Sequence, residues 1–273
     1  MSIIRGMTTT LAKPFVKWAG GKQALSDLIV ERFPTGYETY YEPFLGGGSV
    51  LLTAGPNRAV VSDLNEWLIS TYFAIRDDWR KVAAILDSLP NTKDDFLRIR
   101  EASGTEKRRW HRAAFFIYLN KTCFRGLYRV NRQNQFNVPY GAYERRYYDP
   151  ENFEAVSASL QMVEFRVGDF ELAIDGIKPG DFVYFDPPYY KLGGFSDFNR
   201  YTANQFREPE QLRLAALCRE LDSRGIRWLL SNSDTKFVRS LFNGFRISEI
   251  SSRRDINLQS HKRDVVELIV SNY

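Results

Sequence analysis

The sequence predicts an α/β fold, an open sheet interrupted by a mainly helical insertion, and three observations support this. Short apolar runs alternate with helical patterns up to about residue 64. The alternation stops between residues 65 and 150 and resumes from residue 151 onward. Residues 182–185, Phe-Val-Tyr-Phe, form an apolar run followed by two prolines, as in a buried central strand. We therefore expect one domain from residues 1–64 and 151–273, with residues 65–150 inserted as a second.

The individual elements follow from apolar spacing and from turn signals. A helix is expected from Lys22, with Leu25, Leu28, Ile29 and Phe33 on one face. Strands are expected at residues 40–44, 59–62, 163–168, 182–185 and 226–230, and an antiparallel pair at 245–250 and 265–270. Further helices are expected at residues 65–90, 94–101, 107–120, 208–224 and 236–243. A β-hairpin is expected at residues 127–137, a turn at 231–235, and loops at 191–204 and 251–263.

Composition argues against several classes of protein. With 273 residues, 44% of them hydrophobic, the chain can bury a sizeable core. Its two cysteines, Cys123 and Cys218, suit a reducing cytoplasm and make neither a disulfide framework nor a Cys-x-x-Cys metal site. The sequence shows no membrane-spanning apolar run and no signal-peptide pattern, so we expect a cytoplasmic protein, nucleoid-associated or phage-encoded, without membrane contact. The two histidines, His111 and His261, argue against a zinc deaminase or a His-based triad.

Positive charge is concentrated in one segment of the chain. Residues 107–146 hold ten Lys or Arg residues and one acidic residue, a net charge of +9, whereas the whole chain carries +5. Aromatic residues are interleaved with these charges. Solvated helix faces usually mix both signs, so a one-signed block with aromatics indicates nucleic acid. Arg108, Arg109 and Arg112, at the start of the segment, are expected to attract DNA phosphates.

The motif Asp186-Pro187-Pro188-Tyr189 follows the expected central strand and suggests chemistry on an amine. An exocyclic amine on a base is a poor nucleophile because its lone pair is delocalised into the ring. The Asp186 carboxylate and the Pro187 carbonyl could accept hydrogen bonds from both amine hydrogens. The proline pair would keep these two acceptors rigid. Tyr189 offers a stacking face for the base. Taken alone, the motif is equally compatible with a capping Asp before a proline turn.

A second constellation indicates a nucleoside site. The glycine turn at residues 46–48 enters a helix and lets a ligand approach the backbone. Asp63 ends the next strand, where an acid can accept hydrogen bonds from ribose hydroxyls. The turn lacks both the Gly-x-Gly-x-x-Gly pattern of dinucleotide folds and the Lys-Ser/Thr of a P-loop. Lys22 opposes the dipole of its expected helix, which favours contact with an anionic or carboxylate ligand, although an exposed loop lysine is the commoner case.

Seven motifs occur in order between about Pro14 and Ile269. They are Lys17-Trp18-Ala19-Gly20-Gly21-Lys22, Glu42-Pro43-Phe44-Leu45-Gly46-Gly47-Gly48-Ser49-Val50, Asp63-x-Asn65, Leu119-Asn120-Lys121, Phe136-Asn137-Val138-Pro139-Tyr140-Gly141, Asp186-Pro187-Pro188-Tyr189 and Ser231-Asn232-Ser233-Asp234-Thr235. In this combination the chain resembles the Dam-type (alpha group) DNA adenine-N6 methyltransferases. Each motif alone is unspecific, but the ordered set is specific.

The resemblance implies an enzyme with a seven-stranded, Rossmann-like S-adenosylmethionine-dependent methyltransferase sheet, and a target-recognition domain at residues 65–150. It implies S-adenosyl-L-methionine as cofactor, S-adenosyl-L-homocysteine as product, and no metal. The catalytic group around a flipped adenine would be Asp186, Pro187, Pro188 and Tyr189. The cofactor-binding residues would be Trp18, Lys22, Phe44, Gly46, Asp63, Asp169, Phe170 and Asp186.

The implied partner is double-stranded DNA, with GATC the commonest target in the family. The DNA-binding residues would be Leu127, Arg129, Asn131, Pro139, Lys121 and Arg125, together with Arg108, Arg109 and Arg112. Two departures bear on the target: Arg125 stands where relatives often have Asn, and Asn134 where they often have Gly. A cognate restriction endonuclease acting independently would also be compatible with the family.

Three other readings stay open at this point. A DNA cytosine-N4 methyltransferase would use the same physics but more often has Ser in place of Asp186. A nicotinamide dehydrogenase would need the fuller glycine pattern. A DNA-binding relative without catalytic activity is disfavoured by the intact 186–189 motif, and measuring cofactor binding would separate it from an enzyme.

Overall fold

A computed structural model describes residues 11–131, 133, 135–190, 206–253 and 264–273. The loops expected at residues 191–204 and over most of 251–263 lie outside these ranges. Within the described part, both Cys123 and Cys218 are buried free thiols. No helix there is both long enough and apolar enough to cross a bilayer.

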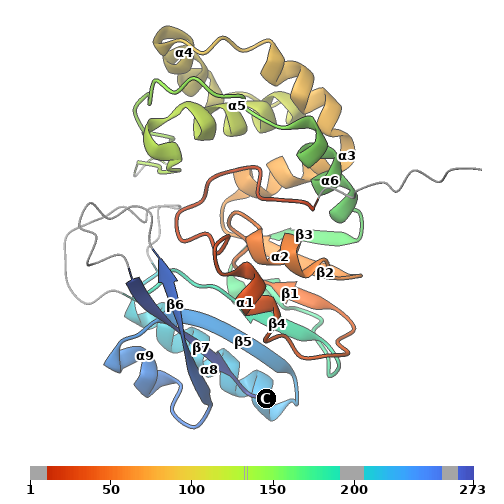
Figure 1. Cartoon of the computed structure of the whole chain (residues 1–273), viewed down its shortest axis with the longest axis vertical. Coiled ribbons are helices and arrows are strands. Elements are labelled where there is room, and N and C mark those ends of the chain that lie inside the picture. Colours follow the sequence, from red (N-terminus) through yellow and green to blue (C-terminus); the bar gives the residue numbers. More distant parts are fainter. Residues whose placement is uncertain (1–10, 132, 134, 191–205, 254–263) are drawn as a thin grey trace, which may run out of the picture.

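Seven strands form one mixed sheet, drawn across the lower part of the molecule in Figure 1. The strands are β1 (Tyr40–Glu42), β2 (Ala59–Asp63), β3 (Val163–Val167), β4 (Phe182–Phe185), β5 (Arg227–Ser233), β6 (Arg246–Arg253) and β7 (Asp264–Ser271). Their order is β3-β2-β1-β4-β5-β7-β6. The first five pair in parallel, and β7 runs antiparallel to both β5 and β6. The predicted α/β class and the closing antiparallel pair are therefore confirmed.

The strand order creates a switch point between β1 and β4. From β1 the chain moves outward through β2 to β3, and β4 then returns to the other side of β1. The register places Tyr40 beside Phe182 and Tyr41 beside Val183, so the two strands end at nearly the same level. Crevices at the carboxyl ends of strands flanking such a point are where open α/β sheets bind ligands.

The predicted helices are all present, although several differ at their ends, and the structure adds two helices that were not predicted, Pro150–Ser159 and Phe170–Ala173. The helices are α1 (Ser26–Val30), α2 (Ser49–Ala54), α3 (Glu66–Asp87), α4 (Lys93–Ser103), α5 (Arg109–Thr122), α6 (Pro150–Ser159), α7 (Phe170–Ala173), α8 (Glu208–Ser223) and α9 (Lys236–Leu241), with a 3₁₀ turn η1 (Phe124–Gly126). Side-chain caps explain several starts: Asn65, for example, accepts a hydrogen bond from the Leu68 amide at the start of α3. Helix α3 is also kinked at Asp78, whose backbone is not helical.

Three predicted elements need correction. The first helix begins at Ser26 rather than Lys22, and its short length leaves Leu28 42% exposed while Ile29 is buried. The turn expected at residues 231–235 is instead the end of β5, because β7 supplies ladder partners as far as Ser233. The hairpin expected at residues 127–137 is reduced, in its described part, to one bridge between Val130 and Phe136.

The reversal in that segment combines side-chain and backbone hydrogen bonds. The Asn131 side-chain oxygen accepts from the amides of Gln133 and Gln135, at 2.9 and 3.0 Å, which turns the chain locally. The Asn137 amide donates to the Arg129 carbonyl at 3.1 Å. The Asn131 amide also donates to the Gln135 carbonyl at 2.9 Å, so two backbone bonds flank the Val130–Phe136 bridge, and the described residues keep a short antiparallel pairing, as in the expected hairpin.

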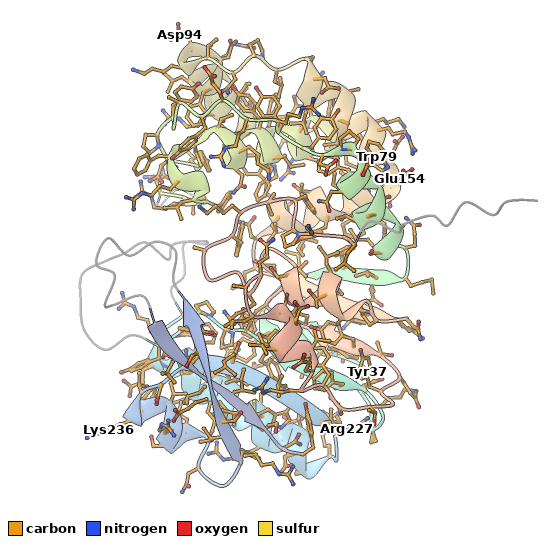
Figure 2. All side chains as sticks on the ribbon, viewed as in Figure 1. Tyr37, Trp79, Asp94, Glu154, Arg227 and Lys236 are labelled. Carbon is orange, nitrogen blue, oxygen red and sulfur yellow. The ribbon has the colours of Figure 1, made fainter. Side chains whose placement is uncertain are left out.

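Each face of the sheet carries its own hydrophobic core. One core includes Val61 and Phe165 of the sheet together with Phe96 and Phe116 of the helices that follow β2. The opposite core packs α7, α8 and α9 against β4 and β5. Figure 1 shows α3, α4 and α5 gathered at one end of the molecule, and Figure 2 places Asp94 of α4 and Lys236 of α9 at opposite extremes. The helices of residues 65–150 thus share their core with one face of the sheet.

Candidate active site

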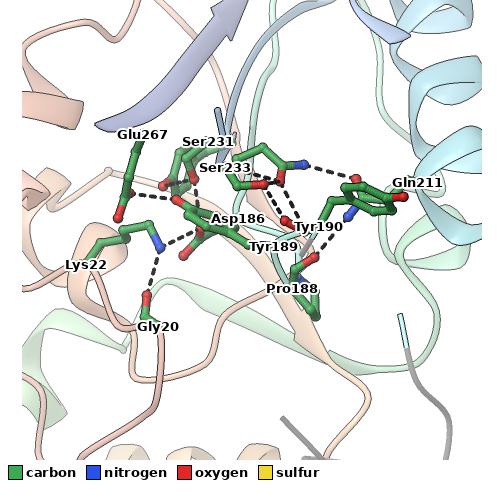
Figure 3. Close-up of polar contacts among 12 residues, drawn as sticks. Gly20, Lys22, Asp186, Pro188, Tyr189, Tyr190, Gln211, Ser231, Ser233 and Glu267 are labelled. Atoms are coloured by element: carbon green, nitrogen blue, oxygen red, sulfur yellow. Dashed lines mark hydrogen bonds and ion pairs between the residues drawn. The ribbon is translucent and has the colours of Figure 1, made fainter. Parts of the chain in front are cut away.

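Asp186 directly follows β4, at the switch point of the sheet. Its Oδ1 atom lies 2.9 Å from the Lys22 ammonium and accepts a 2.7 Å hydrogen bond from the Ser231 hydroxyl (Figure 3). Lys22 is 6% exposed and also donates to the Gly20 carbonyl at 2.7 Å. Among the residues that the structure describes, Oδ2 makes no hydrogen bond or ion pair. One carboxylate oxygen is therefore held by the protein and the other is open to a ligand.

The two proline carbonyls differ in the same way. The Pro188 carbonyl accepts a 3.0 Å hydrogen bond from the Gln211 side chain, which the Asn232 side chain fixes in turn at 3.0 Å (Figure 3). Gln211 and Asn232 are both fully buried. The Pro187 carbonyl has no hydrogen-bond donor among the described residues. Of the two prolines, Pro187 is thus the one with a free acceptor. Its neighbour Pro188 is anchored by Gln211, a residue that no sequence motif singled out.

Tyr189 is held from two sides. Its hydroxyl donates a 2.7 Å hydrogen bond to Glu267 of β7, and the Lys22 ammonium lies 4.4 Å from its ring centroid. Lys22 therefore touches both the carboxylate and the aromatic ring of the 186–189 motif. The sequence indicated that Lys22 faces an anionic or carboxylate ligand, and in the structure the carboxylate is the protein's own Asp186.

The site also contains a buried acid, Glu42, that was not among the candidate residues chosen from sequence. Glu42, at the end of β1, is 3% exposed and accepts a 2.8 Å hydrogen bond from the Tyr40 hydroxyl. Burial raises the pKa of Glu42 to about 8, and the charge of Asp186 adds to this shift. Burial also raises the pKa of Asp186, while Lys22 and Ser231 oppose that shift. Glu42-Pro43 repeats the acid-proline ending of Asp186-Pro187 on the neighbouring strand, a signal that the sequence offered.

A first prediction concerns Glu42 and the pH dependence of stability. Because its pKa in the folded protein lies above the ordinary value of 4.5, its contribution is fully present at low pH and is lost as the pH rises through about 8. Over that window the slope from this group can reach about 1.4 kcal/mol per pH unit. Glu42→Gln mimics the protonated acid and should remove this slope. Urea unfolding of both proteins between pH 5 and pH 9 would measure it, and equal slopes would contradict the prediction.

The glycine turn and Asp63 form a second part of the site, beside the first. Asp63 accepts the Gly46 amide at 3.0 Å and the Asn65 amide at 2.8 Å. Burial raises the pKa of Asp63 to about 6, against the effect of these two bonds. A Cβ atom on Gly46 would lie 2.7 Å from the Trp18 ring, and the φ of Gly46 is +49°, so glycine is required there. Trp18 consequently packs directly on the turn.

Phe44, which precedes the turn in the chain, packs against Phe170, and Asp169 directly precedes Phe170. The rings of Phe44 and Phe170 stack with centroids 5.5 Å apart. Asp169 caps α7 through the Glu171 amide and forms a 2.8 Å ion pair with Arg213. A ligand that used the Asp169 carboxylate would therefore have to share it with Arg213.

The segment around Tyr128, which is expected to read bases, contacts the residues that pack on the glycine turn. Trp18 stacks on Tyr128, with ring centroids 5.3 Å apart. The Asn120 side chain bonds both the amide and the carbonyl of Lys17 at 2.8 Å, and reaches the Gly126 carbonyl at 3.2 Å. Leu127 and Arg129 flank Tyr128 directly. The segment is thereby brought next to the glycine turn.

Several of the basic residues chosen from charge alone are already paired. Arg108 forms an ion pair with Glu106, Arg109 with Asp77 of α3, and Arg112 with Glu66 of α3. Counting acids only within residues 107–146 could not reveal acids supplied by α3. Among the other basic residues, burial lowers the pKa of Lys121 to about 8. Arg125 adopts a positive φ of 59° and lies over the Phe124 ring.

A seven-stranded, mostly parallel sheet with buried acids at its switch point is the arrangement of a Rossmann-like methyltransferase. A family model described as D12 class N6 adenine-specific DNA methyltransferase matches residues 18–256, and the chain belongs to this family. The enzyme therefore methylates adenine in DNA, and the family implies S-adenosylmethionine as methyl donor. Within the described residues, no cluster of three or more His, Cys, Asp or Glu side chains is placed to hold a metal.

Relatives with similar sequences carry matching names. A type II methyltransferase, M.MjaIII, from Methanocaldococcus jannaschii is 38% identical over 96% of this chain and 99% of its own. M1.LlaDCHI, a type II methyltransferase from Lactococcus lactis subsp. cremoris, is 37% identical over 96% and 95%. A DNA adenine methylase from Haemophilus influenzae is 32% identical over 95% and 93%. The alignments thus span nearly the whole of each chain.

Proposed function

We propose that the enzyme methylates the N6 amine of an adenine flipped out of duplex DNA, at the end of β4. The observation that carries the proposal is the pair of open acceptors at Asp186 Oδ2 and the Pro187 carbonyl, beside a stacking face on Tyr189. An adenine inside the duplex could not reach this buried strand end, so the base has to leave the stack. Asp186, Pro187 and Tyr189 would be the catalytic group, with Pro188 as its anchored neighbour.

The residues around the glycine turn suit S-adenosylmethionine. Asp63 is a partly buried acid with further acceptor capacity for ribose hydroxyls, and it is bonded to the amide of Gly46 in the tight turn. We place Trp18, Phe44, Asp169 and Phe170 around the same ligand. When bound, this cofactor supplies a methyl group already activated on a sulfonium, so the protein need not strengthen the leaving group. Its product would be S-adenosyl-L-homocysteine, and the proposal includes no metal.

The chain's own residues would prepare the amine. Asp186 Oδ2 and the Pro187 carbonyl would accept hydrogen bonds from its two N–H groups, which draws the nitrogen toward a tetrahedral geometry and localises its lone pair. Once the methyl group is attached, one of the two protons leaves the nitrogen, with the Asp186 carboxylate as its nearest acceptor. Lys22 and Ser231 hold the other oxygen of Asp186, and Gln211 holds the proline pair, so neither acceptor has to reorganise. Tyr189 would orient the ring by stacking, with its hydroxyl fixed by Glu267.

Target reading is assigned to residues 127–139, with double-stranded GATC as the leading candidate sequence. Arg129 donates from Nε to the Asn137 side chain at 2.9 Å, which orients its guanidinium. Leu127, Asn131 and Pro139 would contribute to base reading beside it. Lys121 and Arg125 would face the DNA backbone. The type II names of two relatives make a restriction partner, acting independently in the same cytoplasm, part of this proposal.

A second prediction tests the reading residue. Arg129→Ala should relax the target at one base pair, because a bidentate arginine–guanine contact discriminates by about 1–3 kcal/mol. Methylated positions in plasmid DNA would be mapped for wild type and variant. Arg80→Ala, which removes an exposed arginine paired with Glu154, is the control and should leave the motif unchanged. An identical motif in the Arg129 variant would remove this residue from base reading.

The function itself is tested by one direct experiment. Plasmid DNA from a host without adenine methylation is treated with the purified protein and S-adenosylmethionine, and modified bases are mapped by sequencing. N6-methyladenine in one short motif is the expected result. Methylcytosine at N4, or methylation without sequence preference, would overturn the proposed substrate or the proposed specificity.

A further inference from the structure

A buried chain of hydroxyl groups ends on the Asp186 carboxylate. The Tyr184 hydroxyl lies 2.9 Å from the Ser231 hydroxyl, which lies 2.7 Å from Asp186 Oδ1. Tyr184 and Ser231 are both fully buried. An ionised carboxylate only accepts, so the single proton of Ser231 must point to Asp186, and Tyr184 must then donate to Ser231. Burial holds the pKa of Tyr184 well above its usual value, so this donor keeps its proton.

The sheet register produces this chain. Tyr184 and Asp186 stand two residues apart, so their side chains leave the same face of the chain. Phe185 of β4 is level with Leu230 of β5, which brings Ser231 beside Asp186. Because β5 continues as a strand through Ser231 rather than turning there, the hydroxyl is held by the backbone ladder with β7. The chain is therefore built from rigid elements.

We propose that Tyr184 and Ser231 are positioning residues that lock the rotation of the Asp186 carboxylate. The inference rests on the proposed role of Asp186 as an acceptor for the amine. The final torsion of an aspartate side chain is broad and roughly two-fold, so an unrestrained carboxylate would exchange its oxygens. Ser231 and Lys22 both contact Oδ1 (Figure 3), so Oδ2 would stay directed at the amine. Ser231 thus sets the orientation of the Asp186 carboxylate, and Tyr184 sets the orientation of the Ser231 hydroxyl.

The same contacts set the charge of the carboxylate. The groups facing Asp186 are Lys22 from the loop before α1, Glu267 from β7, Glu42 from β1, and the hydroxyls of Ser231, Tyr184 and Tyr189. Burial and Glu267 raise the pKa of Asp186, whereas Lys22 and Ser231 lower it. Removing the Ser231 hydroxyl should therefore raise this pKa further. Since the ionised form is the acceptor, the acid limb of the pH profile of methyl transfer should move to higher pH.

The test compares Ser231→Ala and Tyr184→Phe with wild type, using the full-length protein. Single-turnover transfer of labelled methyl groups to DNA is measured from pH 5.5 to pH 9 at saturating S-adenosylmethionine. Losing a hydrogen bond to a charged group predicts about a 10- to 100-fold slower transfer for Ser231→Ala, with the acid limb moved upward. Tyr184→Phe should slow transfer less, by about 3- to 10-fold, with a shift in the same direction. Affinities for S-adenosylmethionine and DNA should stay within about twofold in both variants.

Two further variants separate the possible failures. Thr71→Val removes another fully buried hydroxyl, which bonds the Trp67 carbonyl at 2.7 Å in α3, and should leave the rate and pH profile of transfer unchanged. Asp186→Asn tests the acceptor itself. If Asp186→Asn abolishes transfer while Ser231→Ala and Tyr184→Phe behave as wild type, the positioning inference is wrong and the proposed function stands. If Asp186→Asn remains fully active, the role of Asp186 is wrong. Should Ser231→Ala fail to fold, Tyr184→Phe, which lacks one oxygen atom, decides the question.

Discussion

Asp186→Asn should slow methyl transfer by about 10²- to 10³-fold or more, the cost of removing one aimed polar group from a reacting centre. The side-chain oxygen of asparagine would stay with Lys22 and Ser231, as Oδ1 does now. The amide nitrogen would then occupy the place of Oδ2 and point its hydrogens at the amine, so an acceptor is replaced by a donor. Residues 107–146 are untouched, so DNA affinity should stay near that of wild type.

Single-turnover transfer and DNA binding, measured on the same preparation, would check this expectation. Tyr189→Phe is an informative companion, because it keeps the stacking ring and loses only the hydrogen bond to Glu267. We expect it to retain most of the activity. Tyr189→Ala would lose the stacking ring itself, and base–aromatic stacking contributes about 1–3 kcal/mol per base. Near-wild-type transfer by Asp186→Asn would mean that the carboxylate merely neutralises Lys22, and another acceptor would have to be sought.

Asp63→Ala should weaken S-adenosylmethionine binding by about tenfold or more, since a hydrogen bond to a charged group contributes about 1.5–3 kcal/mol. The substitution also removes the acceptor for the Gly46 and Asn65 amides, so part of the loss would come from a loosened turn. Isothermal calorimetry with the cofactor, combined with thermal unfolding of the free protein, would report both effects.

The chain offers a matched control at the opposite end of the sheet. Asp181 precedes β4, is 1% exposed, and also accepts two backbone amides, from Thr39 and Lys178, each at 3.1 Å. Asp181→Ala should therefore lower stability much as Asp63→Ala does, without affecting cofactor affinity. If both variants bound the cofactor equally, Asp63 would be a structural cap and the ribose would lie elsewhere.

Local pattern was sufficient to predict the sheet from sequence. Residues 182–185 are short, apolar and bounded by proline, and they form β4 as expected. The two strand-end acids, Asp63 and Asp186, could be selected because a parallel sheet gathers its carboxyl ends at one edge. Glu42 ends the strand between them and could have been chosen by the same rule.

Contacts between residues that are distant in the sequence could not be predicted from the sequence. The Lys22–Asp186 pair joins residues more than 160 positions apart, and no periodicity encodes it. Asp77 and Glu66 neutralise arginines of α5 only because α3 packs beside that helix. The polar end of β5 looked like a turn because its strand character comes from pairing with β7. In each case tertiary contacts outweighed the local signal.

The position of Trp18 has a consequence for engineering new specificities. Its ring packs on the Gly46 turn on one side and on Tyr128 on the other, and Phe116 lies behind it. A chimaera that received residues 65–150 from a relative would therefore inherit a foreign surface against this tryptophan. Tyr128 and Phe116, which Trp18 contacts, are buried, and truncating a buried aromatic side chain of this size costs about 3–5 kcal/mol, so a mismatched interface at this point could unfold the recipient. Since Arg129 is the residue proposed to read the target, altering single side chains around it, with the aromatic contacts of Trp18 kept, is the safer route to enzymes that methylate other DNA sequences.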